Sequence, residues 1–175
     1  MRRDPIKIVA YDPEWPKLFA RERDRLESIL SPWLVEPIEH IGSTAVPGLP
    51  AKPIIDMVAP IADYATFHSA LPALDQLGWV QASEPGDEAA RKWSICFPEV
   101  GWRTHHLHVV EHRSAYWRDW LAFRDHLRAD SDTAAEYGEI KAELASRDHH
   151  DRTAYRAGKA PFICGVLDQL RQPPH

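Results

Sequence analysis

Two short patterns in the sequence place polar side chains inside apolar, strand-like segments. Asp56 interrupts the apolar run from Pro53 to Val58, and a buried carboxylate is costly unless it is paired or holds a metal. His106 and His108 alternate with apolar residues, so a strand here carries both imidazoles on one face. If the two strands are neighbours, Asp56, His106 and His108 form a metal site, in which imidazole with carboxylate favours Zn, Mn, Fe or Ni over Mg. Two solvent-facing histidines are the competing interpretation.

The segment ahead of the Asp56 strand has the composition of a phosphate-binding turn. Gly42, Ser43 and Thr44 supply a glycine that permits close backbone approach, two hydroxyls and exposed N–H groups that bind anions. Lys52 follows and offers a positive charge to an anionic ligand. The alternatives are a tight turn stabilised by its hydroxyls and a solvated lysine.

Three further residues lie close to these patterns in the sequence. His40 precedes the glycine turn and is a candidate metal ligand, general base or hydrogen-bonding brace for the loop, and we favour the brace. Glu39 alternates with His40 and should point to the opposite side, towards an arginine. His105 should face away from the histidine pair and play a structural part.

The C-terminal third carries basic and aromatic residues at helical spacing. Three pairs share a helix face because their members lie four residues apart: Arg124 and Arg128, Tyr137 and Lys141, and Tyr155 and Lys159. In one interpretation, the basic members line a cleft that holds phosphate or another acid, with the tyrosines as stacking or hydrogen-bonding partners. In the other, their aliphatic stems cover buried tryptophans and their charges pair with neighbouring acids.

Composition limits the class of protein. A chain of 175 residues that is 44% hydrophobic can bury one sizeable core, and its net charge of −5 argues against broad nucleic-acid binding. Two cysteines among apolar neighbours indicate buried, reduced thiols. Arg2-Arg3 precedes an apolar run too short for a secretory signal, and no transmembrane segment is evident. We therefore expect a cytoplasmic protein with a small-molecule partner and no membrane partner.

The pattern of apolar residues predicts an α/β (α+β) fold with a mixed central sheet. Strands are expected at 6–9, 35–41, 54–58, 92–97 and 105–110, and helices from about 13 to 31 and at 63–77, 115–128, 133–146 and 151–170. Residues 82–90 read as a mobile loop, Thr133 with Glu136 has capping-box spacing, and Pro161 predicts a kink or restart in the last helix. Residues 1–113 should form the α/β core and residues 114–175 a helical lobe packed on it.

The candidate residues belong to a longer pattern. The sequence resembles the GrpB family through two adjacent segments, Glu39-His40-Ile41-Gly42-Ser43-Thr44-Ala45-Val46-Pro47-Gly48-Leu49 and Ala51-Lys52-Pro53-Ile54-Ile55-Asp56. Further matches follow along the chain: Asp12-Pro13-Glu14-Trp15-Pro16, His106-Leu107-His108-Val109, Phe123-Arg124-Asp125-His126-Leu127-Arg128, Tyr137 with Lys141, and Tyr155 with Lys159. The resemblance implies a nucleotidyltransferase-like fold, in which a Gly-Ser turn leads to a strand bearing metal-binding acids. It also implies a link with dephospho-CoA kinase, to which the family is fused in some bacteria.

One departure from that superfamily's pattern bears on function. Its acids come as a pair one residue apart, whereas Asp56 has Val58 as its same-face neighbour. The leading hypothesis is a metal-dependent nucleotidyl or phosphoryl transferase acting on a nucleotide or small phosphorylated compound, with Mg, Mn or Zn as the ion. In it Ser43 and Lys52 hold phosphate and Arg124 neutralises developing charge. The alternatives are a non-catalytic nucleotide-binding or ligand-binding module that has lost the acid pair, and a hydrolase with a histidine-metal site.

Overall fold

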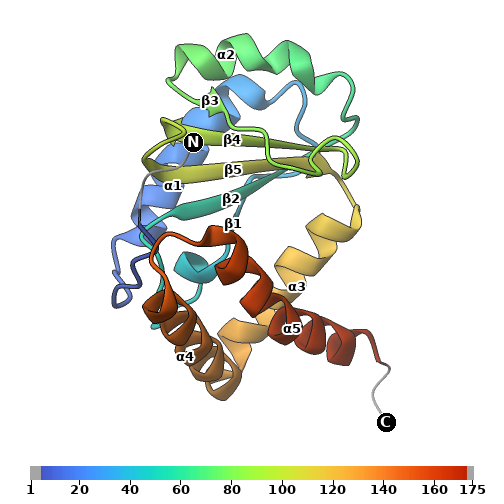
Figure 1. The fold of residues 1–175 in the computed structure, drawn as a ribbon. Coiled ribbons are helices and arrows are strands. Elements are labelled where there is room, and N and C mark those ends of the chain that lie inside the picture. Colours follow the sequence, from blue (N-terminus) through green and yellow to red (C-terminus); the bar gives the residue numbers. More distant parts are fainter. Residues whose placement is uncertain (1–4, 173–175) are drawn as a thin grey trace.

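A five-stranded mixed sheet forms the centre of the fold (Figure 1). The computed structural model describes residues 5–172, so the twin arginine lies outside it. The strands are β1 (Glu39–Ile41), β2 (Ile55–Ile61), β3 (Val80–Gln81), β4 (Lys92–Pro98) and β5 (Arg103–Glu111), in the spatial order β1-β2-β5-β4-β3. The central pair, β2 and β5, is parallel, and the other pairs are antiparallel. Two strands distant in the sequence thus lie side by side at the centre.

Helices cover the sheet on both faces. On one face lie α1 (Trp15–Leu30), the short helix η2 (Phe67–Ala70) and α2 (Leu71–Gln76), and they enclose the main apolar core with Met57 and Leu107 of the central strands. On the other face, α3 (Ala115–Ala129) packs Trp117 against Val58 and Val110. Because side chains alternate along a strand, odd-numbered positions of β2 and β5 belong to the main core and even-numbered positions face the C-terminal helices.

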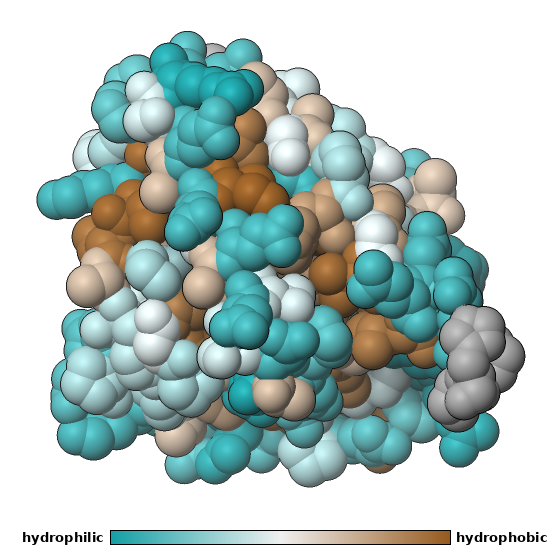
Figure 2. Space-filling model, turned by 90° about the horizontal axis from the view of Figure 1, so that it is seen from below, coloured by the Kyte–Doolittle hydropathy of each residue, from teal (hydrophilic) through white to brown (hydrophobic). Residues whose placement is uncertain are grey.

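The C-terminal helices form a lobe below the sheet (Figure 1). It consists of α3, α4 (Ser131–Arg147) and α5 (Arg152–Arg171). Between β1 and β2, the short helix η1 (Ser43–Ala45) leads into a segment whose Val46 and Leu49 pack against Leu127 and Tyr137 of the lobe. Figure 2 looks onto this end of the molecule and shows a mostly hydrophilic surface with separate hydrophobic patches. None of the helices within residues 5–172 has the length and apolar character needed to span a bilayer.

Several predicted elements differ from the observed ones. Residues 6–9 form no strand and contribute only an isolated bridge between Val9 and Ala51. The strand expected at 35–41 is confined to residues 39–41, and the helix expected at 63–77 is divided into η2 and α2. The two-residue strand β3, which follows Gly78, was not predicted. The corrections to the strands share a cause, since short strand pairings depend on the neighbouring strand rather than on local periodicity.

The helices of the lobe match their predicted positions, with two differences at their caps and interior. Asp130 caps α4 by accepting hydrogen bonds from the amides of Asp132 and Thr133, so the helix begins before the predicted capping box. Pro161 lies inside α5, which continues from Arg152 to Arg171 without a restart.

The two cysteines differ from each other in burial. Cys96 is buried, as predicted, whereas Cys164 is exposed and corrects the expectation of two buried thiols. Cys164 lies on α5, where a partly apolar sequence faces solvent beyond the lobe's small core.

Candidate functional site

The parallel pairing of β2 with β5 brings the predicted metal ligands together. Asp56 lies opposite His106 in the register, and His108 follows on the same face of β5. Asp56 Oδ1 is 3.6 Å from His106 Nδ1 and 4.0 Å from His108 Nε2, and the two imidazole centroids are 4.0 Å apart. One donor atom from each of the three side chains lies within 4.8 Å of the others. This separation is compatible with three ligands of one ion after small side-chain adjustments.

Burial and protonation also suit these residues to a metal. The Asp56 side chain is 34% exposed, whereas those of His106 and His108 are 7% and 14% exposed, so the group is reached from the carboxylate side. Burial, reinforced by the neighbouring His106, lowers the pKa of His108 well below its usual value, which favours the neutral imidazole that binds metals. Among residues 5–172, no group hydrogen-bonds to the buried Nδ1 of His108. Because Nε2 is the ring nitrogen that faces Asp56, Nδ1 is the one that would normally hold an outer hydrogen bond and orient a metal-bound imidazole, and the described residues supply none to it.

The Gly-Ser turn touches the Asp56 carboxylate. Gly42 has φ +71° and ψ −173°, a conformation that only glycine adopts readily. A Cβ atom at Gly42 would lie 2.8 Å from Asp56 Oδ2 and 3.1 Å from Asp56 Cβ. Glycine is therefore required here for both the backbone conformation and the close approach, and the turn carrying Ser43 lies directly beside the candidate metal ligands.

His40 lies on the opposite face of the sheet from Asp56, opposite Met57 in the register. Its Nε2 is 3.0 Å from Thr44 Oγ1, and the Thr44 hydroxyl donates to the carbonyl of Ile54 at 3.2 Å. Because that hydroxyl proton is used, Thr44 accepts a hydrogen bond from His40. Phe19 stacks on the imidazole, and burial lowers the pKa of His40 to about 4. The brace we favoured from the sequence is the arrangement found, and the structure does not bring His40 to the metal ligands.

Two lysine side chains lie beside the ring of Tyr155, within the electrostatic reach of Asp56. Lys52 Nζ and Lys159 Nζ lie 5.2 Å and 4.7 Å from the ring centroid of Tyr155. Burial raises the pKa of Tyr155, and the Asp56 charge raises it further. The pKa of Tyr137 is raised by burial, by Tyr155 and by Asp56, and a hydrogen bond with the Ser43 side chain opposes the change. These shared effects place both tyrosines in the electrostatic environment of Asp56 and the turn.

Three other predicted cations bind backbone carbonyls between the sheet and the lobe. Arg124 donates to the carbonyl of His40 at 2.9 Å and to Glu39 Oε2 at 2.6 Å, which confirms the expected pairing of Glu39 with an arginine. The same type of bond joins two further pairs: Arg128 to the carbonyl of Ala45 at 2.8 Å, and Lys141 to the carbonyl of Pro50 at 2.5 Å. These hydrogen bonds hold segment 39–50 to the lobe, so Arg124, Arg128 and Lys141 bind backbone carbonyls here and do not form the basic, phosphate-holding cleft that we considered for them.

Lys141 is an unusual member of this set because it is almost completely buried, at 2% exposure. Its ammonium nitrogen lies 4.9 Å from the ring centroid of Tyr137. Burial, with the positive charges of Lys159 and Lys52, lowers the pKa of Lys141 to about 7. The side chain therefore exchanges between its charged and neutral forms near neutral pH.

A polar network on β4, β5 and the 82–91 loop was missed by the sequence analysis. Lys92 Nζ lies 2.7 Å from Asp87 Oδ1 and donates to Ser94 Oγ at 2.9 Å. Glu84 pairs with Arg103 of β5 at 3.4 Å and with Arg156 of α5 at 3.0 Å. The alternation of Lys92, Ser94 and Cys96 was the available signal, since it places polar groups on the Asp56 face. The loop is irregular, as predicted, but these ion pairs hold it to the sheet and the lobe.

Arg103 connects this network to the candidate metal ligands. Its guanidinium lies 3.4 Å from His106 Nε2, and because arginine only donates, Nε2 accepts in this arrangement. The other ring nitrogen, Nδ1, then carries the proton and faces Asp56. A metal on Nδ1 of the neutral imidazole would require the proton on Nε2, so the hydrogen bond from Arg103 would have to be given up for His106 to become a ligand.

Val58 occupies the position at which the superfamily's pattern has a second acid. It is completely buried and packs with Ile41, Val110 and Trp117 where α3 meets the sheet. This position is therefore part of an apolar contact, and the polar face of β2 ends with Asp56.

Comparison with known proteins agrees with the resemblance. The family model described as GrpB protein matches residues 5–169. A UPF0157 protein of Streptomyces coelicolor is 36% identical over 162 residues, covering 92% of this chain and 82% of that protein. A dephospho-CoA kinase of Mycolicibacterium paratuberculosis is 28% identical, over 92% of this chain but 45% of the kinase.

Two solved structures share the fold. The crystal structure of conserved protein GrpB from Enterococcus faecalis has a TM-score of 0.82 and 26% identity, over 95% of this chain and 100% of that one. A chain in the structure of the GLD-2/RNP-8 complex has a TM-score of 0.59 and 15% identity, over 95% of this chain and 62% of that one, a likeness in fold alone. Since the family match extends over nearly all of the sequence that forms the sheet, the turn and the lobe, this chain belongs to the GrpB family.

Proposed function

We propose that this protein is a metal-dependent phosphoryl or nucleotidyl transferase that acts on a nucleotide or a small phosphorylated compound. One observation carries the proposal: the donor atoms of Asp56, His106 and His108 converge within 4.8 Å, directly beside the Gly42 turn. A metal site next to a turn that can bind phosphate is the combination that phosphoryl transfer requires.

The ligand set favours a first-row transition ion. Two imidazoles and one carboxylate are typical of zinc, manganese or iron sites, whereas magnesium prefers oxygen ligands. When bound, such an ion would act as a Lewis acid towards a phosphoryl oxygen. Because Val58 is part of the apolar core, we propose a site for one ion and not for the paired ions held by two acids.

The surrounding residues supply contacts for an anion. The ammonium groups of Lys52 and Lys159 lie 5.2 Å and 4.7 Å from the ring centroid of Tyr155, and the pKa of Lys159 is lowered by burial and raised in part by the Asp56 charge. Ser43 adds a hydroxyl, and the first two residues of η1, Ser43 and Thr44, add backbone amides, whereas the amide of Ala45 already donates to the carbonyl of Gly42. A phosphate beside Asp56 would accept hydrogen bonds from the turn and neutralise the two lysines, while Asp56 itself is kept from repelling it by the bound cation.

Purified protein provides the first test, through its metal content. We expect about one equivalent of zinc, manganese or iron in the wild-type protein and its loss in Asp56→Asn, because removing one of three ligands weakens a site strongly. Asp75→Asn is the matched control, since Asp75 is an exposed carboxylate on α2. Wild-type protein that takes up none of these ions, even after incubation with each, would exclude the proposed metal centre.

A ligand screen tests the substrate class. Nucleotides and coenzyme A precursors, each with Mg or Mn, should raise the melting temperature of the wild-type protein and not of Lys52→Ala, because a ligand that binds only the folded state stabilises it in proportion to its affinity. Release of phosphate or pyrophosphate from the ligands that bind would then show turnover.

A non-catalytic ligand-binding module is the second candidate, and the burial of Val58 favours it because the position of a second acid has become part of the core. The two candidates differ in one outcome of the screen. Binding of a nucleotide without any release of phosphate or pyrophosphate, in the presence of each ion, would support the binding module. Release of phosphate or pyrophosphate with water as the only acceptor would indicate the hydrolase.

A further inference from the structure

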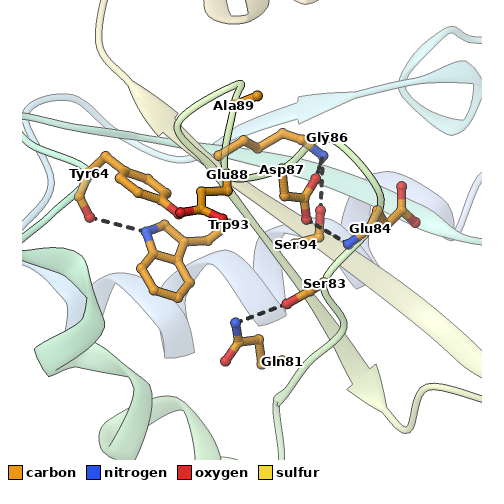
Figure 3. A pocket seen from close by; sticks show the side chains of 11 residues that line it. Tyr64, Gln81, Ser83, Glu84, Gly86, Asp87, Glu88, Ala89, Trp93 and Ser94 are labelled. Atoms are coloured by element: carbon orange, nitrogen blue, oxygen red, sulfur yellow. Dashed lines mark hydrogen bonds and ion pairs between the residues drawn. The ribbon is translucent and has the colours of Figure 1, made fainter.

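A hollow lies at the edge of the sheet, away from the candidate metal ligands. It has a volume of about 540 Å³ and is enclosed by the 82–91 loop, β4 and the end of β3 (Figure 3). This volume is within the usual range for small-molecule sites, about 300–1,000 Å³. The residues that matter for its chemistry are Tyr64, Gln81, Ser83, Glu84, Asp87 and Trp93.

One wall of this edge pocket is aromatic. The rings of Tyr64 and Trp93 stack with centroids 5.1 Å apart and an angle of 29° between their planes, and both side chains are half-buried. The indole N–H of Trp93 donates to the carbonyl of Tyr64 at 3.2 Å, which fixes the indole in place. Arg91 lies over the Tyr64 ring, 5.3 Å from its centroid, and Phe67 packs against Trp93, so the pocket offers a fixed aromatic wall against which a flat ring can pack.

The end of the pocket nearest β3 carries an amide and a hydroxyl (Figure 3). Gln81 donates one N–H to Ser83 Oγ at 3.0 Å. A glutamine amide also has a second N–H and a carbonyl oxygen, so it can pair with an adjacent donor and acceptor on one edge of a heterocycle. This is the way in which glutamine recognises a nucleobase edge.

The charge of the lining disfavours an anion. Of the three carboxylates in the lining, Asp87 is paired with Lys92 and Glu84 with Arg103 and Arg156, so Glu88 supplies the remaining negative charge. Asp87 and Lys92 both have side chains only 10% exposed, so they form a fixed wall. A phosphate would be repelled here, whereas a neutral or weakly basic ring with amino groups would find acceptors.

We propose that the edge pocket binds a nucleobase. The inference goes beyond the proposed function and does not depend on it. Trp93 is the register partner of Val109 and Gln81 that of Ile95, so both belong to the sheet face that carries the main core, opposite Asp56. A base held by Trp93 and Gln81 therefore occupies a site separate from the candidate metal ligands.

Nucleosides without a phosphate test the pocket separately from the metal site. Adenosine, guanosine, cytidine and uridine should be titrated into ¹⁵N-labelled wild-type protein while the Trp93 indole and Gln81 amide signals are followed. We expect at least one nucleoside to shift both signals, and Gln81→Ala to weaken its Kd about tenfold, since a bidentate base contact is lost. Gln76→Ala, an exposed glutamine on α2, is the matched control and should leave the Kd unchanged.

The outcomes also separate this inference from the proposed function. Asp56→Asn should retain nucleoside binding, so binding without any metal uptake would support the pocket while refuting the metal centre. If none of the four nucleosides shifts the Trp93 and Gln81 signals of folded protein, the pocket does not bind nucleobases. The same conclusion follows if a nucleoside binds equally well to wild type and Gln81→Ala.

Discussion

Replacing Gly42 with alanine tests the contact between the turn and the Asp56 carboxylate. The conformation of Gly42, φ +71° and ψ −173°, costs other residues about 1–3 kcal/mol. The added methyl group would lie 2.8 Å from Asp56 Oδ2, and crowding of this kind typically costs a further amount of about 1–3 kcal/mol. Part of this cost is relieved if the carboxylate rotates, but Asp56 Cβ, at 3.1 Å, must then move as well.

Gly48→Ala is the matched comparison. Gly48 also has a positive φ, +80°, but within residues 5–172 no atom lies less than 4 Å from the place its methyl group would take, so only the backbone cost of about 1–2 kcal/mol applies. We expect Gly42→Ala to be less stable than Gly48→Ala by about 2–3 kcal/mol in urea unfolding. For a chain of this length, the melting temperatures should differ by about 4–12 °C.

A double-mutant cycle with Asp56→Ala assigns the difference to the carboxylate. Shortening Asp56 removes the Oδ2 contact, so Gly42→Ala should cost less in that background, with a coupling energy of about 1 kcal/mol or more. Equal stabilities of Gly42→Ala and Gly48→Ala, together with additive effects in the cycle, would refute the reasoning. The turn would then be able to move away from Asp56 without a loss of stability.

Three further predictions concern buried basic side chains, those of Arg124, Lys141 and His40. Arg124→Met should lower the free energy of unfolding by about 1–3 kcal/mol, because the carbonyl of His40 loses its donor, and a stability equal to wild type in urea would contradict this. The pKa of Lys141 in the folded protein is about 7, below its unfolded value, so above neutral pH the unfolded state binds more protons and the free energy of unfolding should rise with pH. Lys141→Met should flatten that rise, as measured by urea midpoints up to pH ~9. His40, with a folded pKa of about 4, should stay neutral at pH ~5 in NMR spectra of its ring nitrogens. It should contribute stability that is lost as the pH falls from ~6.5 towards 4. A His40 ring that titrates near 6.5 would contradict its role as a buried hydrogen-bonding brace.

The candidate site was predictable to the extent that side-chain alternation determines it. His106 and His108 share a face in any strand, and a lone Asp56 in an apolar run signals a cost that must be compensated. What the sequence could not supply is the parallel pairing of β2 with β5, whose register partners, such as Asp56 and His106, are 50 positions apart and are brought together by long-range packing. The convergence of Asp56 with the histidines therefore became visible only in the sheet.

The residues whose roles were least predictable are those whose partners lie far away in the sequence. Arg124 and Lys141 have the sequence signature of a basic helix face, but their carbonyl partners lie more than eighty residues away. Glu84 was assigned to a loop because Pro85 and Gly86 break local structure, which gave no indication of its ion pairs with Arg103 and Arg156. Helix periodicity predicted the lobe itself well, since it depends on neighbours three and four residues apart.

The bonds from Arg124, Arg128 and Lys141 to the carbonyls of His40, Ala45 and Pro50 have a consequence for how the chain can be divided. They cross the boundary at residue 113, and a fragment ending there would expose those acceptors together with the apolar side chains of Val46 and Leu49. Insertions, fusions and truncations between the sheet and the lobe should therefore destabilise the protein. Any longer protein that contains this unit has to carry it whole.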